Sequence, residues 1–270
     1  MKPYYQDKWV TIYHGDCREI LPTLEKVDLV LTDPPYFIPA KHYETRRLFR
    51  RTFGDLGILE SFFKGLFDDL DKVLKQDGLL YMFCDGQSYP LFYYYAYFIT
   101  KAVRPLIWDK KVSFNGYYWR HQHEIILFGV RPEKHKIPTG DGDILRYSAV
   151  KVDKRMHPAE KPIDLLSHII RATASEDATI LDPFLGSGTT AYCAKKLGRK
   201  CIGIEISEDY CRIAAQRCAQ AVLPLEVEQV KQGQGVSKPT MFSGMTLTTK
   251  GNKIRGKMSI NQVSEETDRE

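Results

Sequence analysis

The sequence predicts an α/β fold, with an open, doubly wound and mostly parallel β-sheet that carries helices on both faces. Two observations support this prediction. Short, continuously apolar segments stop at polar turns, as in residues 27–33 before Pro34 and residues 178–182 before Pro183. Such strands are typical of parallel sheets that are covered on both sides. Segments with helical periodicity separate them along the chain, and this alternation is typical of doubly wound sheets.

The remaining elements follow from the same two patterns. Further apolar segments are expected to form strands at residues 78–84, 105–108, 124–128 and 200–205. Helical periodicity predicts helices at residues 57–76, 89–101, 162–174, 188–198 and 207–221. The helix at 89–101 is crowded with Tyr and Phe, and we expect this aromatic stripe to pack in the core.

Composition indicates one main domain. The chain has 270 residues, of which 43% are hydrophobic, enough for a sizeable buried core. From about residue 225 the sequence turns to Gln, Gly, Ser, Thr and Lys. We therefore expect a folded domain at 1–224 and a flexible tail at 225–270. Residues 131–156 have weak periodicity and are expected to form a long loop or a small insertion.

Charge and cysteine usage limit the partners and the compartment. The formal net charge of +5 permits a polyanionic partner without proving one. One short segment gathers basic residues around a single acid, Glu44, and these are Lys41, Arg46, Arg47, Arg50 and Arg51. A solvated helix face and a phosphate-binding surface both fit this run. None of the six cysteines has CxxC spacing, so we expect no metal site and a reducing compartment.

The apolar segments are short. The most apolar of them, residues 91–99, has about half the length that a membrane span requires. The first residues lack the apolar core of a secretory signal. We expect a cytoplasmic protein with no membrane partner.

A glycine-rich turn follows the strand predicted at 178–182. Its sequence is Leu-Asp-Pro-Phe-Leu-Gly-Ser-Gly-Thr-Thr at residues 181–190, where Gly186 and Gly188 allow a tight turn close to a ligand. Glu205 ends the next predicted strand, where an acid of a nucleotide-binding α/β fold binds ribose hydroxyls. Neither a Gly-Lys-Ser/Thr phosphate loop nor the third glycine of a dinucleotide fingerprint is present. A ligand with a ribose but no pyrophosphate fits this pattern better.

A second motif, Asp33-Pro34-Pro35-Tyr36, follows the strand at 27–33. Two consecutive prolines keep the chain extended at the carboxyl end of the sheet, where such folds bind ligands. The Asp33 carboxylate and the Pro34 carbonyl could each accept one hydrogen of an exocyclic base amine. This would free the nitrogen lone pair to attack a sulfonium methyl group, while Tyr36 offers a flat face to an extruded base.

The two motifs and their order resemble the beta group of DNA amino-methyltransferases, in which the catalytic motif precedes the cofactor motif. The resemblance covers roughly residues 9–221, through the segments 10–17, 28–36, 78–85, 108–110, 120–127, 157–162 and 182–190, with Glu205. It implies a Rossmann-like methyltransferase fold with permuted motif order. It also implies S-adenosyl-L-methionine as the methyl donor and DNA, with its target base flipped out, as the substrate.

The resemblance implies roles for individual residues. The residues that would contact the target base are Asp33, Pro34, Pro35 and Tyr36. The residues that would line the cofactor are Asp182, Phe184, Gly186, Ser187, Gly188, Thr189 and Thr190. Glu205 would bind its ribose, and the two threonines are expected to cap the following helix. The residues that would lie on the other side of the cofactor are Asp16, Cys17, His157 and Lys161.

DNA recognition is expected to involve residues 37–60, with the basic run, and residues 131–156. Tyr118, Trp119 and Arg120 are further candidates, because aromatic residues beside Arg can stack on an unpaired base.

Several alternatives stay open at this point. Asp33 favours N6 of adenine, because cytosine-N4 enzymes of the group usually carry Ser there, yet N4 of cytosine fits the same chemistry. RNA or protein-glutamine methylation and an inactive DNA-binding module are less favoured readings. The recognition sequence, a homodimer and a cognate restriction endonuclease are left undecided by the sequence.

Overall fold

The structure of the chain is a computed structural model that describes residues 1–35, 56–112, 119–131, 140–150 and 160–220. These residues all belong to one compact unit, Met1–Glu226. The tail expected at 225–270 lies outside the described residues.

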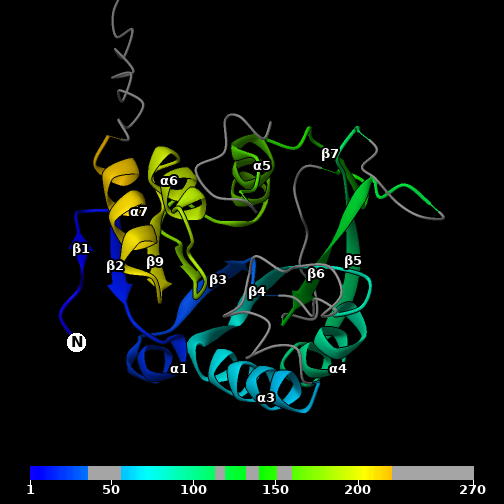
Figure 1. Cartoon of the computed structure of the whole chain (residues 1–270), viewed down its shortest axis with the longest axis horizontal. Helices are drawn as coiled ribbons and strands as arrows, with labels where there is room; N and C mark the ends of the chain where they lie inside the picture. The colour runs from blue at the N-terminus through cyan, green and yellow to red at the C-terminus, as the bar shows by residue number, and fades with distance from the viewer. Residues whose placement is uncertain (36–55, 113–118, 132–139, 151–159, 221–270) are drawn as a thin grey trace, which may run out of the picture. The chain divides into compact units, whose positions relative to one another are not determined.

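The described residues form a nine-stranded sheet with the order β1-β2-β9-β8-β3-β4-β6-β5-β7 (Figure 1). The strands are β1 (Tyr5–Gln6), β2 (Val10–His14), β3 (Val27–Thr32), β4 (Leu74–Cys84), β5 (Ala102–Asp109), β6 (His123–Val130), β7 (Ile144–Arg146), β8 (Thr179–Asp182) and β9 (Lys200–Glu205). The five strands β2, β9, β8, β3 and β4 are parallel to one another, whereas β6 pairs antiparallel with β4 and β5. The predicted doubly wound, mostly parallel sheet is confirmed.

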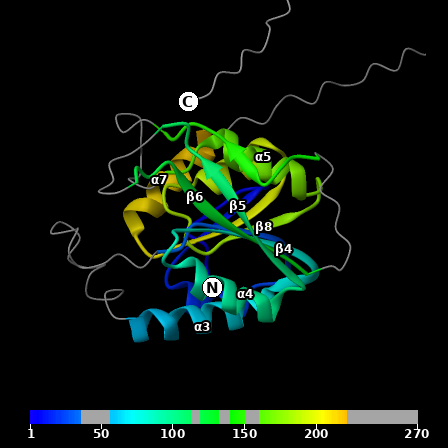
Figure 2. The ribbon, with the colours of Figure 1, turned by 90° about the vertical axis from the view of Figure 1, so that its right-hand side faces the viewer.

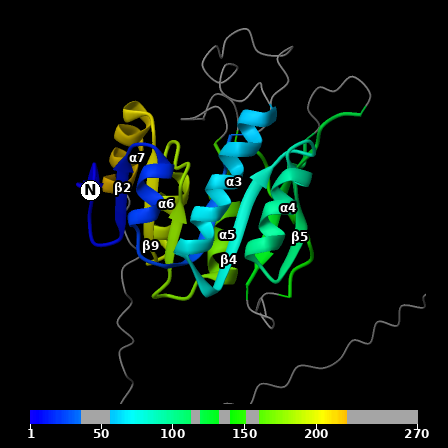
Figure 3. The same ribbon diagram turned by 90° about the horizontal axis from the view of Figure 1, so that it is seen from below.

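Helices cover both faces of this sheet. They are α1 (Cys17–Ile20), the 3-10 turn η1 (Leu21–Thr23), α3 (Leu56–Val73), α4 (Tyr89–Ile99), α5 (Ile163–Thr173), α6 (Thr189–Lys196) and α7 (Glu208–Gln220). Figure 2 shows α5 on one side of the sheet and α3 and α4 on the other. Seen from the second side in Figure 3, α3 and α4 run next to each other.

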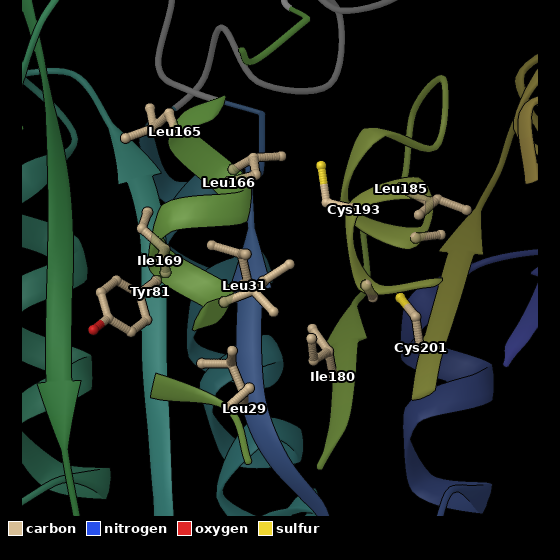
Figure 4. Close-up of a cluster of buried hydrophobic side chains, with 14 of the residues drawn as sticks. Leu29, Leu31, Tyr81, Leu165, Leu166, Ile169, Ile180, Leu185, Cys193 and Cys201 are labelled. Atoms are coloured by element: carbon tan, nitrogen blue, oxygen red, sulfur yellow. The ribbon is translucent and has the colours of Figure 1, made fainter. Parts of the chain in front are cut away.

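The strands form a core on both faces because their side chains alternate. On β3, Leu29 and Leu31 face one buried cluster while Val30 faces the other. The first cluster packs against α5, α6 and α7, as in the contacts of Leu31 and Ile169 (Figure 4). The second packs against α3 and α4. A strand that is buried on both faces reads as a continuous apolar run, which is why sequence alone located β3 and β8.

The helix predicted at 57–76 is shorter than expected. It ends at Val73, and Leu74 already begins β4. The buried guanidinium of Arg131 explains the change of direction, because it donates to the carbonyls of Asp71 at 3.0 Å and Leu74 at 2.6 Å. The residue after β6 therefore supplies hydrogen-bond donors to a carbonyl in the last turn of α3 and to the first carbonyl of β4.

The segment 131–156 is not simply a loop. Its residues 144–146 form β7, an edge strand that pairs in parallel with β5. Leu145 is buried, and the carbonyl of Tyr147 accepts the indole N–H of Trp108 at 2.7 Å. In the other segment expected to recognise DNA, residues 56–60 belong to α3.

The aromatic helix α4 departs from the expectation of core packing. Phe92 is fully buried, but Tyr93, Tyr94, Tyr97 and Phe98 are exposed by 40% to 69% of their surface. The expectation was wrong for these four residues. In the described part of the chain, no helix combines the length and the apolar character needed to cross a bilayer.

Candidate active site

The candidate site lies at one edge of the sheet, where three neighbouring parallel strands end. Asp33 directly follows β3, the glycine turn follows β8, and Glu205 is the last residue of β9. Carboxyl ends of parallel strands meet at the same edge, which is where open α/β sheets bind ligands. The two predicted motifs, about 150 residues apart in sequence, are thus adjacent in space because β3 pairs with β8.

A direct hydrogen bond joins the two strands at this edge. The Thr32 hydroxyl donates to Asp182 Oδ1 at 2.7 Å, and the backbone N–H of Phe184 donates to the same oxygen at 3.1 Å. Asp182 is only 3% exposed. Burial raises the pKa of Asp182 to about 6, and hydrogen bonds from Thr190, Thr32 and Phe184 oppose that rise.

The glycine turn is tied to Glu205. The backbone N–H of Gly186 donates to Glu205 Oε2 at 2.8 Å, and the N–H of Ser207 donates to Oε1 at 2.9 Å. Burial raises the pKa of Glu205, against the effect of these N–H groups. The next residue, Ile206, exposes 69% of its surface. An acid beside an exposed apolar side chain fits a nucleoside, whose ribose needs hydrogen bonds and whose base needs an apolar contact.

The two glycines of the turn have different surroundings. Both have positive φ, 55° at Gly186 and 83° at Gly188. A Cβ at Gly186 would meet nothing within 4 Å, whereas a Cβ at Gly188 would lie 2.7 Å from Ala214 Cβ on α7. Gly186 therefore presents backbone to open space, as expected for a ligand site. Gly188 is needed so that the start of α6 can pack against α7.

The two threonines do not cap α6 as expected. Gly188 is the N-cap residue, and it makes no side-chain capping bond. Instead, Thr189 Oγ1 accepts a hydrogen bond from the Arg217 guanidinium at 3.0 Å, and the Thr190 side chain bonds to Asp182. Both are buried, as is Ser187, so these side chains support the turn from within.

Asp33 lies beside a buried cation. Lys161 Nζ, just before α5, is 2.5 Å from Asp33 Oδ2 and 3.3 Å from Glu124 Oε2. Glu124 also pairs with Lys110, at 2.6 Å between Oε1 and Nζ. Burial alone would lower the pKa of Lys161, but the carboxylates of Asp33 and Glu124 outweigh it and raise this pKa. The structure thus places Lys161 against Asp33, whereas the resemblance implied a position on the other side of the cofactor.

The residues after β2 were expected to contact the cofactor, and they have local structural partners. The Asp16 carboxylate caps α1 through the backbone N–H of Arg18 and pairs with its guanidinium at 2.5 Å. These bonds hold the pKa of Asp16 below its usual range. The Cys17 thiol is buried in the cluster under α3, and burial raises its pKa to about 12. Cys17 therefore contributes packing rather than a reactive thiolate.

The remaining predicted residues are placed only in part. Pro34 is buried and Pro35 is half-buried after β3. Trp119 and Arg120 are exposed before β6, Trp119 by 89% of its surface. Several predicted residues lie outside the described part of the chain, namely Tyr36, Lys41, Arg46, Arg47, Arg50, Arg51, Tyr118 and His157.

Four residues of this edge had no assigned role in the sequence reading: Thr32, Lys110, Glu124 and Ile206. Glu124 and Lys110 stand inside motif segments that the resemblance used, but no local pattern links a glutamate that opens an apolar strand to a lysine that follows another. An apolar residue after the strand-ending acid was the one available signal for Ile206.

Comparisons with known proteins agree with this geometry. A family model described as DNA methylase matches residues 27–216. YubD of Escherichia coli (strain K12), named as a methylase, is 33% identical over 212 residues, which cover 76% of this chain and 88% of that protein. YhdJ of the same organism, named as a DNA adenine methyltransferase, is 26% identical over 253 residues, which cover 77% of this chain and 82% of that protein. The solved PvuII DNA methyltransferase, described as cytosine-N4-specific, shares the fold with a TM-score of 0.65 at 20% identity, over 80% of this chain and 88% of that one.

The family model spans well over half of the chain and includes both the Asp33 turn and the glycine turn. The Asp33 turn comes first in sequence and the glycine turn second. The chain belongs to the N6/N4 family of DNA methylases, enzymes that use S-adenosylmethionine to methylate an exocyclic amine of adenine or cytosine.

Proposed function

We propose that this protein methylates N6 of adenine in DNA, with Asp33 as the residue that contacts the target amine. The observation that carries the proposal is the position of Asp33 at the carboxyl end of β3, next to the glycine turn that follows β8. An amine held by Asp33 would lie close to a methyl donor held by that turn. Positioning of this kind supplies a large part of the rate enhancement when the donor is already activated.

The donor site is built from three contributions. Glu205 offers carboxylate oxygens to the ribose hydroxyls, and the exposed side chain of Ile206 offers an apolar surface to the adenine ring. Gly186 leaves room for close approach to its backbone. Asp182, buried behind the turn, holds the turn through the N–H of Phe184. S-adenosylmethionine supplies the electrophilic methyl group when bound.

The acceptor site holds the amine. The exocyclic nitrogen is a poor nucleophile, because its lone pair is delocalised into the ring. Hydrogen bonds from the amine to the Asp33 carboxylate and to the Pro34 carbonyl would pull the nitrogen toward a tetrahedral geometry and free that lone pair. The rigid Asp33-Pro34-Pro35 turn keeps these two acceptors at a fixed separation. The base must leave the duplex to reach them.

Methylation of N4 of cytosine is the second candidate. It is supported by the likeness of fold to the PvuII enzyme, which is described as cytosine-N4-specific. Adenine is favoured by the acid at position 33 and by the similarity to YhdJ, named as an adenine methyltransferase. Both reactions use the same amine chemistry, so the size and hydrogen-bond pattern of the base pocket decide between them.

One experiment separates the two candidates. The protein is incubated with methyl-labelled S-adenosylmethionine and, in separate reactions, with unmethylated DNA or an RNA of the same sequence, and each nucleic acid is digested to nucleosides and analysed by mass spectrometry. We expect label in N6-methyldeoxyadenosine. Label in N4-methyldeoxycytidine would establish the second candidate, and label only in an RNA of the same sequence would overturn DNA as the substrate.

A further inference from the structure

Lys161 is enclosed by the acceptor side of the site. Its ammonium lies 2.5 Å from Asp33 Oδ2 and 3.3 Å from Glu124 Oε2, and 4.8 Å from the centre of the Phe83 ring. The side chain is 8% exposed. A buried ammonium is costly unless carboxylates surround it. Lys161 is therefore held between the carboxylate of Asp33, in the proposed catalytic motif, and the carboxylate of Glu124, to which the sequence analysis assigned no role.

A second layer fixes the Glu124 carboxylate. Lys110 Nζ lies 2.6 Å from Glu124 Oε1 and 5.0 Å from the centre of the Trp108 ring. The Trp108 indole is itself held by the carbonyl of Tyr147. Glu124 Oε2 is buried, and Lys161 is its ion-pair partner. The order of contacts is thus Asp33, Lys161, Glu124 and Lys110, two carboxylates and two ammonium groups in alternation.

The backbone that carries Lys161 is anchored from the other side. Glu160 Oε1 pairs with Arg217 Nη1 of α7 at 2.9 Å, and both side chains are buried. Two neighbouring residues therefore bind different parts of the domain. Glu160 binds helix α7, and Lys161 binds the residue that follows β3. This double attachment leaves the Lys161 ammonium little freedom to leave Asp33.

Asp33 needs such a partner for the proposed reaction. Among the described residues, Cys84 on β4 and Asp182 on β8 are two further ionisable groups in electrostatic reach of Asp33. Ionised Asp182 would repel a charged Asp33, and partial burial opposes the charge as well. In the reaction the amine nitrogen forms a bond to the methyl carbon, the electron pair of the carbon–sulfur bond moves to sulfur, and one amine proton is released. A carboxylate that is already ionised can accept that proton and pass it to solvent.

We propose that Lys161 is a positioning residue that keeps Asp33 ionised and correctly oriented, and that Glu124 with Lys110 holds Lys161 in place. The proposal rests on the proposed catalytic role of Asp33. It differs from a role of Lys161 on the cofactor, which the family resemblance implied. The two roles separate in measurement, because a positioning residue changes turnover and its pH dependence, while a cofactor contact changes the affinity for S-adenosylmethionine.

The experiment compares Lys161→Met, Lys161→Arg and Glu124→Gln with the wild type. The control is Lys195→Met, because Lys195 on α6 is also a mostly buried lysine in an ion pair, with Asp7 at 2.6 Å. For each protein, single-turnover rates are measured on DNA from pH 5 to pH 9, together with S-adenosylmethionine affinity by calorimetry. Asp33→Ala is measured in parallel.

We expect Lys161→Met to reduce turnover by about ten-fold or more and to move the acid limb of the pH profile upward by about 1–3 pH units, the usual effect of losing an adjacent opposite charge. Removing the cation favours protonated Asp33, so the limb moves to higher pH. Lys161→Arg keeps the cation and so keeps the limb, with reduced turnover. Glu124→Gln removes a negative charge, so its limb does not move upward, although turnover falls. Lys195→Met keeps the wild-type profile.

The outcomes separate this proposal from the one on which it rests. If Asp33→Ala keeps wild-type turnover, the proposed catalytic role of Asp33 is wrong, and the role of Lys161 that rests on it is wrong as well. If Asp33→Ala is inactive but Lys161→Met keeps the wild-type limb, or loses only cofactor affinity, the positioning role is overturned alone. If Lys161→Met does not fold, Lys161→Arg and Glu124→Gln decide, and unchanged turnover in both would overturn the proposal.

Discussion

The Thr32 hydroxyl donates a hydrogen bond to Asp182 Oδ1 across 2.7 Å, although the two residues are 150 positions apart. Thr32 ends β3, immediately before the Asp33 turn, and Asp182 ends β8, immediately before the glycine turn. The bond therefore links the strand that presents the proposed amine acceptor to the strand that presents the proposed donor site. Because both groups are buried, the bond is also hard to replace by water.

Asp182 gives stability an unusual pH dependence. Its pKa is raised to about 6 in the native state, above the ordinary value near 4 of an unfolded chain. The native state therefore binds the proton more tightly, and the stability linked to that proton is present below about pH 4 and lost as pH rises through about 6. Asp182→Asn has no charge to bury and keeps an oxygen for Thr32. We expect the difference in free energy of unfolding between Asp182→Asn and the wild type to change in favour of the variant as pH rises from 4 to 7, by up to about 3 kcal/mol.

Urea unfolding of the wild type and Asp182→Asn at both pH values measures this gain. Asp177→Asn, an exposed acid in the turn before β8, is the control and should show no such difference. An equal stability difference between wild type and Asp182→Asn at the two pH values would contradict the raised pKa.

Glu205 is predicted to bind the ribose of the methyl donor. Glu205→Ala removes the carboxylate that faces the Gly186 turn, and it should weaken S-adenosylmethionine binding by about 1.5–3 kcal/mol, the range for a lost charged hydrogen bond. Calorimetry measures the affinity directly. Glu208→Ala, which changes an acid in the first turn of the neighbouring helix α7, is the control. Equal affinity of Glu205→Ala and the wild type would reject the ribose assignment.

The two glycines of the turn are predicted to fail in different ways. Gly188→Ala should destabilise the protein by more than about 1–2 kcal/mol, because left-handed strain adds to the clash with Ala214. Gly186→Ala carries the strain without the clash, so it should fold better but bind S-adenosylmethionine less tightly. Thermal unfolding and calorimetry on both variants test the pair. If Gly186→Ala were the less stable protein and kept full affinity, the assignment of the two glycines would be reversed.

The basic run is predicted to contact DNA phosphates. Arg46→Ala combined with Arg47→Ala should weaken DNA binding and reduce its salt slope by about one unit per lost phosphate contact. The recognised site should stay the same, because phosphate contacts carry no base information. Lys26→Ala combined with Lys200→Ala is the matched control, since it removes the same charge just before β3 and at the first residue of β9, where these two parallel strands begin. A double variant at 46 and 47 that kept the wild-type affinity and slope would leave a solvated surface as the explanation.

The sequence located the strands of the sheet centre well, and physical reasons explain this success. Strands β3, β8 and β9 are buried on both faces, so their apolar runs have sharp ends at Asp33, Pro183 and Glu205. β7 was missed, because three residues are too few for a pattern. The exposure of α4 was missed because no position of the helix carries a charged residue and most carry Tyr or Phe, which hides the difference between its inner and outer faces.

The acceptor side of the site was harder to predict. The sequence identified Asp33 and Lys161 separately, but the 2.5 Å contact between them joins positions 128 residues apart. Glu124 lies in a segment of the family resemblance, but no local pattern predicts its ion pairs, since its partners come from the residue after β5 and from the segment before α5. Ion pairs of this kind depend on the topology of the sheet and leave no periodicity in the chain.

The most direct test of the central claim is the separation of catalysis from cofactor binding at Asp33. Methyl transfer to DNA and S-adenosylmethionine affinity are measured for Asp33→Ala beside Asp177→Ala, an exposed acid in the turn before β8. We predict that Asp33→Ala abolishes transfer and binds S-adenosylmethionine with wild-type affinity, while the control keeps both. An Asp33→Ala protein that retained more than about a tenth of wild-type turnover, equivalent to less than about 1.4 kcal/mol of transition-state stabilisation, would contradict the role of Asp33 at the target amine.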